Sequence, residues 1–124
     1  MCAEKSKICS GGPTLIFSCS GAADVGEISD RAARNLTKEG AGSMFCLAGV
    51  GGRVEPILKK TASASKILAI DGCNLDCVKL TLEQAGFKNV IHMRVTDLGM
   101  EKGKSPATEE NINKAAAKGK ELIG

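Results

Sequence analysis

The sequence contains no tryptophan and no tyrosine, and its only aromatic residues are three phenylalanines. Proteins that bind single-stranded nucleic acid stack bases on aromatic side chains, and only Phe17, Phe45 and Phe87 are available for that purpose. The net charge is +3, from 17 basic and 14 acidic residues that are spread along the chain. Composition and charge therefore argue against a nucleic-acid partner.

Long apolar segments are also missing. No apolar run approaches the roughly 20 residues of a transmembrane helix, so we expect no membrane-spanning segment. The first residues, Met1 to Lys7, lack the positively charged segment followed by an apolar core that marks a secretory signal. We therefore expect a cytoplasmic protein. In that reducing compartment, six cysteines indicate metal binding or catalysis more than structural disulfides.

Several enzyme signatures are absent. A low-molecular-weight phosphatase or arsenate reductase needs a cysteine and an arginine separated by five residues, but Val25 stands where Cys19 would need its arginine, and six residues separate Cys46 from Arg53. The glycine motifs of dinucleotide folds and P-loops are missing too. The single histidine, His92, lies in the middle of an expected strand. We interpret it as a structural residue more than a metal ligand or general base.

Short apolar runs alternate with segments of helical periodicity, which predicts four strands and four helices. The expected strands are 14–19, 43–48, 66–71 and 89–95. Helices connect them, so the strands should run parallel. The predicted fold class is an α/β three-layer sandwich, Rossmann-like or flavodoxin-like. The favoured strand order is 2-1-3-4, which places the two most apolar strands in the middle.

The expected helices have recognisable ends. Asp24 with Glu27 forms a capping-box pattern for the first, the second starts near Pro56, the third spans 74–85, and Thr108 caps the fourth. Apolar stripes should face the core; they include Val25, Ile28, Ala32, Leu36, Val54, Ile57, Leu75 and Val78. We predict a flexible leader over residues 1–13 and one domain over 14–124.

Three cysteines follow the expected strand ends. Cys19 ends the first strand, and Cys73 and Cys77 follow the third. In parallel sheets, ligands bind beyond the carboxyl ends of the strands where strand order reverses, so these thiols should meet at the crevice between the first and third strands. If a helix begins at once after Cys73, the sulfurs of Cys73 and Cys77 lie over the same side of its first turn. The unpaired amides and the positive end of the helix dipole would lower the pKa of a thiol placed there.

Cys46 admits two interpretations. In the first, its strand ends early before a glycine-rich loop that folds over the crevice. In the second, Cys46 is buried in the core, as free cysteine often is. Four thiolates would close a tetrahedral zinc site, whereas three would leave a position open. Cys9 is an alternative fourth ligand, although a free thiol is the simpler expectation for it. For residues 49–53 we favour a plain turn over an anion cradle.

The motifs fall in the order of a known family. The stretches 17–26 and 46–52, the Asp71-Gly72-Cys73 triplet with Cys77, and residues 96–99 resemble the DGC-domain family of zinc-binding proteins over nearly the whole chain from Cys9 onward. The resemblance implies a small α/β protein whose cysteines bind zinc, and it names no reaction.

We therefore predict one zinc ion, bound by Cys19, Cys46, Cys73 and Cys77. Asp24 and Asp71 are candidates to orient the ligands, although helix capping is the default role for each. The partner is a metal ion, and the role is metal binding, handling or sensing. The alternative is a thiol–disulfide or persulfide redox enzyme that uses Cys73 with Cys19 or Cys77.

Overall fold

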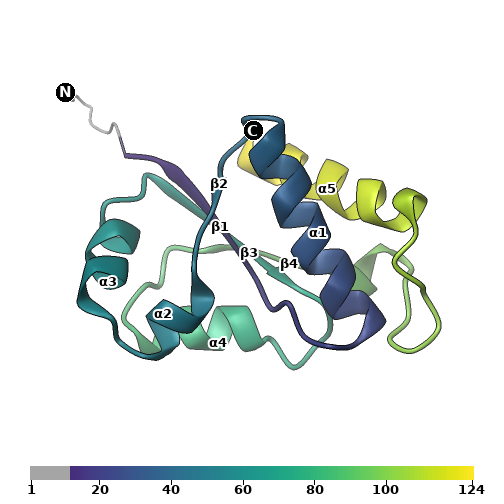
Figure 1. The fold of residues 1–124 in the computed structure, drawn as a ribbon, viewed down its shortest axis with the longest axis horizontal. Helices are drawn as coiled ribbons and strands as arrows, with labels where there is room; N and C mark the ends of the chain where they lie inside the picture. Colours follow the sequence, from purple (N-terminus) through teal and green to yellow (C-terminus); the bar gives the residue numbers. More distant parts are fainter. Residues whose placement is uncertain (1–11) are drawn as a thin grey trace.

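The sheet has the predicted arrangement. The computed structural model describes residues 12–124, and in it four parallel strands lie in the order β2-β1-β3-β4 (Figure 1). The strands are β1 (Thr14–Ser18), β2 (Ser43–Met44), β3 (Lys66–Asp71) and β4 (Ile91–Arg94). The two most apolar strands, β1 and β3, pair along their full common length at the centre of the sheet. The prediction of fold class and strand order is confirmed.

Helices cover both faces of the sheet. One face packs against α1 (Asp24–Lys38) and α5 (Glu109–Ile123). The other packs against α2 (Leu47–Gly51), α3 (Glu55–Ala62) and α4 (Cys77–Gln84). A short 3₁₀ helix, η1 (Val95–Leu98), follows β4. Figure 1 shows α1 and α5 together on one side and the three shorter helices on the other.

Alternation along the central strands explains these layers. Ile16, Leu68 and Ile70 point into the core beneath α1 and α5, whereas Leu15 and Phe17 point toward the other three helices. All five side chains are buried. Their removal from water is the main stabilising contribution to the domain. Both central strands therefore carry a fixed register, and their carboxyl ends reach the same edge of the sheet.

Three of the four predicted strands have wrong boundaries. The first strand ends at Ser18 instead of residue 19. The second strand ends at Met44 instead of residue 48, because Cys46 caps a helix, α2, that the sequence did not reveal. The fourth strand covers Ile91–Arg94 instead of residues 89–95, because Val95 already starts the 3₁₀ turn. The glycine-rich residues after Cys46 lie in α2 and its end. The predicted plain turn is therefore also corrected.

Two expected core residues are exposed. The third predicted helix starts at Cys77 instead of residue 74, so Leu75 lies in the preceding turn and is 61% exposed. Val54 stands just before α3 as its N-cap and is 46% exposed. Neither position belongs to a helical stripe. The stripe of α1 is buried as predicted, at Val25, Ile28, Ala32 and Leu36.

Of the predicted helix caps, Thr108 is confirmed and Asp24 is wrong. Thr108 caps α5 as expected, since its hydroxyl accepts the amide of Asn111. Asp24 is not the cap of α1: the helix begins at Asp24 and Ala23 occupies the N-cap position. The predicted leader falls mostly outside the described residues, and so do Cys2 and Cys9. Of its last two residues, Gly12 and Pro13, both carbonyls accept hydrogen bonds from Ser65.

Within the described residues, none of the helices combines the length and the apolar character needed to cross a bilayer.

Candidate functional site

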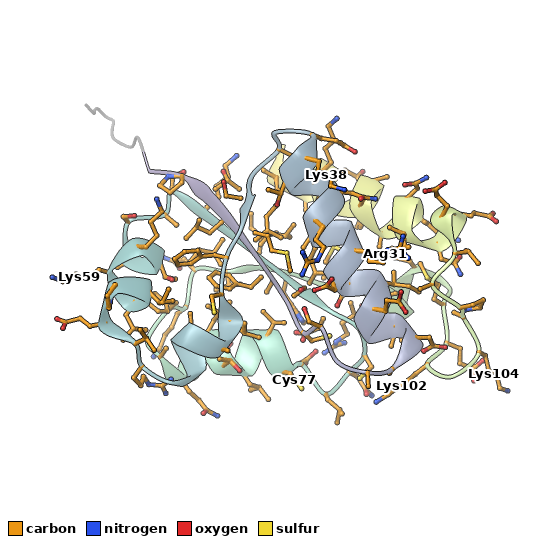
Figure 2. All side chains as sticks on the ribbon, viewed as in Figure 1. Arg31, Lys38, Lys59, Cys77, Lys102 and Lys104 are labelled. Carbon is orange, nitrogen blue, oxygen red and sulfur yellow. The ribbon has the colours of Figure 1, made fainter. Side chains whose placement is uncertain are left out.

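Three of the predicted cysteines line one cavity at the carboxyl edge of the sheet. Cys19 follows β1, Cys73 follows β3, and Cys77 opens α4. Their side chains border a cavity of about 220 Å³, whose wall also contains Lys102 from the loop after η1. Figure 2 shows Cys77 and Lys102 at the same edge of the molecule. The topology therefore brings together thiols that are 54 and 58 positions apart in the sequence.

Close backbone packing positions Cys73. A Cβ atom at Gly72 would lie 2.9 Å from the carbonyl carbon and oxygen of Val25 and 3.1 Å from the amide nitrogen of Gly26. Only glycine lets β3 approach the first turn of α1 this closely. The glycine of the Asp71-Gly72-Cys73 triplet thus sets the separation between the segment carrying Cys73 and the first turn of α1.

Substitution of Gly72 by alanine should lower the free energy of unfolding by about 2–3 kcal/mol, because the added methyl group meets backbone atoms that cannot rotate away. Urea denaturation followed by far-ultraviolet circular dichroism measures the loss. Gly21→Ala is the matched control, since a Cβ atom there has no neighbour within 4 Å. Equal stability of the Gly72 and Gly21 variants would contradict the steric argument.

Cys19 is held by a buried hydroxyl. Its sulfur lies 3.2 Å from the Ser29 hydroxyl, which in turn donates to the Gly26 carbonyl at 2.7 Å. Ser29 is fully buried in α1. Because the serine proton is directed to the carbonyl, the serine oxygen is left to accept the thiol proton of Cys19. The arrangement fixes the sulfur at the cavity wall.

The environment of Cys77 opposes its ionisation. Loss of hydration raises the pKa of this thiol most, followed by the negative charges of Asp71, Cys19 and Cys73; Lys102 acts in the opposite direction. The pKa of Cys77 is therefore raised, contrary to the sequence-based expectation that a helix terminus lowers it. Thiolates that face one another repel, and a bound cation removes that repulsion.

Cys46 lies apart from the other three cysteines. It is exposed, it forms the N-cap of α2, and its sulfur accepts the Gly49 amide at 3.3 Å. It does not line the cavity that Cys19, Cys73 and Cys77 share. The interpretation of Cys46 as a buried core residue is therefore wrong. The alternative, in which its strand ends early, agrees with the observed end of β2.

Asp71 organises the start of α4. Its carboxylate is buried and accepts the amides of Val78 at 2.8 Å and Lys79 at 3.2 Å. His92 Nε2 lies 2.9 Å from the same carboxylate. Asp71 thus caps the helix that carries Cys77, as its default interpretation predicts. The contact of His92 with this carboxylate agrees with the structural role expected from the sequence.

Asp76 extends this network. Its backbone is left-handed, with a φ of 55°. Arg94 donates two hydrogen bonds of 2.7 Å to its carboxylate, and these lower the pKa of Asp76 most. The pair holds the turn between Cys73 and Cys77 against β4. Sequence analysis did not find this contact, because it depends on the register between β3 and β4.

Asp71, Asp76 and His92 form a group of metal-ligand type whose ligand atoms all lie within 4.8 Å of one another. Such a group could hold a cation. Here, however, Asp71 is engaged by two amides and His92, and Asp76 is engaged by Arg94. These partners already satisfy much of the acceptor capacity of both carboxylates. We interpret the group as a set of structural contacts that hold the turn between Cys73 and Cys77 in place.

Asp24 binds the loop that carries Lys102. Its carboxylate accepts the amides of Val25 at 2.7 Å, Gly103 at 2.9 Å and Ser105 at 3.1 Å. The Gly103 bond contributes most to keeping the pKa of Asp24 below its usual value. The predicted helix-capping role of Asp24 is replaced by this contact between α1 and a distant loop.

Comparison with known proteins agrees with the sequence-based resemblance. The model of the DGC domain matches residues 15–118. Anaerobic and virulence modulator AnvM of Pseudomonas aeruginosa strain PAO1 is 34% identical over 88 residues, which cover 71% of this chain and 67% of that protein. No solved structure matches. The family match spans both strands that deliver the cysteines and the loop that carries Lys102, and the chain belongs to the DGC-domain family.

Proposed function

We propose that this protein binds one zinc ion at the carboxyl edge of its sheet and serves in metal handling or sensing. Cys19, Cys73 and Cys77 are the principal ligands, and Cys46 is the fourth and weakest. The observation that carries the proposal is the convergence of three thiols on one cavity of about 220 Å³, one from the end of β1 and two from the stretch after β3. Family membership supports metal binding in general.

The donor atoms suit zinc. Thiolates are soft ligands and favour zinc over magnesium or calcium. In a tetrahedral site with zinc–sulfur distances of about 2.3 Å, neighbouring sulfurs lie about 3.8 Å apart. The sulfurs of Cys19, Cys73 and Cys77 are not grouped within 4.8 Å of one another. Binding would therefore require rotation of these side chains, and Cys77 is exposed enough to allow it.

Cys46 would bind more weakly than the other three. Its sulfur would have to give up the Gly49 amide and turn toward the cavity from the neighbouring strand end. A site with three firm ligands and one labile ligand exchanges metal more readily than a closed one. The name of the relative describes a modulator, which favours handling or sensing over catalytic turnover.

Thiol redox chemistry is the second candidate, because the same cavity holds Cys73 with both of its predicted partners. Formation of a disulfide between Cys73 and Cys19 or Cys77 would release two electrons and two protons to an external oxidant. A positively charged lysine beside Cys73 is compatible with either function. Metal content and oxidation state distinguish the two.

The decisive experiment is native mass spectrometry of protein purified under strict reduction without added metal, with a free-thiol count before and after chelation. We expect one zinc per chain and additional reactive thiols once a chelator removes it. Metal-free protein with two thiols missing until reductant is added would overturn the zinc proposal and establish the redox pair.

A further inference from the structure

The loop of residues 99–106 is fixed over the thiol cavity. In addition to the two bonds from Gly103 and Ser105 to Asp24, the Glu101 amide donates to the Ser105 hydroxyl at 2.8 Å. The Lys104 amide donates to the Glu101 carbonyl at 2.9 Å. Asp24 therefore connects the start of α1 to a loop 79 and 81 positions away, and the loop itself is closed by a turn.

This loop places one cation beside one sulfur. Lys102 Nζ lies 3.7 Å from Cys73 Sγ. Both residues line the thiol cavity, and both also line an adjacent depression of about 520 Å³. The lysine and the sulfur thus stand together where a molecule from solvent would reach Cys73.

Within the described part of the chain, charged side chains near Lys102 pair with one another, which leaves the Lys102 ammonium free to contact a ligand. Arg94, which also lines the depression, is engaged by Asp76 at 2.7 Å. Glu101 lies 3.9 Å from Lys104. Among residues 12–124, Lys102 forms no ion pair within 4.0 Å, and Asp97 is the acidic residue in the wall of the depression. Lys102 therefore presents a positive charge at the mouth of the site that no ion pair among residues 12–124 neutralises.

We propose that Lys102, held in place by Asp24, makes Cys73 selective for small anionic ligands and reagents, such as carboxylates and thiolates. Lys102 is the specificity-determining residue, and Asp24 is a positioning residue. The proposal concerns the reduced, metal-free protein, so it does not rest on zinc binding.

Coulomb's law gives the expected size of the effect. Two unit charges about 4 Å apart interact by roughly 1 kcal/mol in a fully aqueous dielectric, which corresponds to about a fivefold change in an equilibrium or rate constant. Lys102 is exposed, so this aqueous value applies. Salt should weaken the preference, because exposed charges are screened.

The test uses two alkylating reagents of nearly the same size, iodoacetate with a negative charge and iodoacetamide without one. In both reactions the sulfur displaces iodide, and peptide mass spectrometry measures the rate at Cys73 in reduced, chelator-treated protein. Both rates are proportional to the fraction of Cys73 that is ionised, so their ratio does not depend on that fraction. We expect Lys102→Gln to lower the ratio of iodoacetate to iodoacetamide about fivefold, and Lys102→Glu to lower it further.

Lys104→Gln is the matched control. It removes the same charge from the same loop, but from a side chain that is 75% exposed and lies near Glu101, so it should leave the ratio unchanged. Asp24→Ala should lower the ratio toward that of Lys102→Gln, because the loop loses the acceptor of two of its amides.

An unchanged ratio in Lys102→Gln would overturn the proposal, and so would an equal loss in Lys104→Gln. An unchanged ratio in Asp24→Ala would overturn the role of Asp24. Absence of zinc in native mass spectrometry would reject the proposed function and leave this result standing, so the two failures are distinguishable.

Discussion

Substitution of Cys73 by serine should abolish stoichiometric zinc binding and leave the fold intact. Cys73 directly follows the central strand β3 and lines the cavity together with Cys19 and Cys77. A serine hydroxyl is not a thiolate, and at neutral pH it is a poor zinc ligand. The measurement is zinc per chain by native mass spectrometry, which should fall from one to none.

The fold should survive because its core does not depend on the metal. Large apolar side chains of β1 and β3 are buried on both faces of the sheet, and a domain of this size needs no metal to fold. Far-ultraviolet circular dichroism of Cys73→Ser should therefore match that of the wild type. Loss of the whole fold in this variant, or retention of one tightly bound zinc, would contradict the prediction.

Cys46→Ser is the control that tests whether Cys46 binds zinc more weakly than the three cysteines of the cavity. Cys46 is exposed and lies outside the cavity, and its sulfur accepts the Gly49 amide. This variant should still carry one zinc per chain and lose it at a lower chelator concentration than the wild type. Complete loss of zinc, equal to that of Cys73→Ser, would show that Cys46 is as firm a ligand as the others.

The sheet was predictable because two signals agreed. Short apolar runs marked the strands, and single connecting helices required them to be parallel. The length of β2 was not predictable, since residues 43–48 are apolar enough for a strand. What shortens it is the start of α2 at Leu47, with Cys46 as the capping residue. Cysteine is a weak acceptor and gives no recognisable cap signal in a sequence.

The convergence of Cys19, Cys73 and Cys77 could be predicted from strand order, because the carboxyl ends of adjacent parallel strands lie at the same edge of the sheet. The side-chain contacts around these thiols could not be predicted from the sequence. The contacts of Asp71 with His92 and of Asp76 with Arg94 require the register of β4 on β3. The contact of Asp24 with residues 103 and 105 requires the path of a loop, which periodicity does not determine.

Asp71 gives the largest stability effect that we expect from a polar side chain. It is only 1% exposed and accepts the amides of Val78 and Lys79 as well as the hydrogen bond from His92. Substitution by alanine would leave two amides at the first turn of α4 and one imidazole without their acceptor. Each buried group left unsatisfied costs about 1–3 kcal/mol, and the loss of a helix cap alone costs about 1 kcal/mol.

Asp71→Ala should therefore lower the free energy of unfolding by about 3 kcal/mol and the melting temperature by roughly 10 °C. The chain lacks tryptophan and tyrosine, so urea and thermal unfolding are followed by circular dichroism. Asp97→Ala is the control: it removes a carboxylate that also follows a strand but is exposed, and its effect should stay within about 0.5 kcal/mol.

The same substitution should also weaken zinc binding, for a reason separate from stability. Asp71 fixes the helix that begins at Cys77, so its loss frees one of the three cavity thiols from its position. At a temperature where the variant is fully folded, zinc should leave Asp71→Ala at a lower chelator concentration than it leaves the wild type, while Asp97→Ala should match the wild type. Wild-type stability of Asp71→Ala would show that the buried carboxylate does not hold α4.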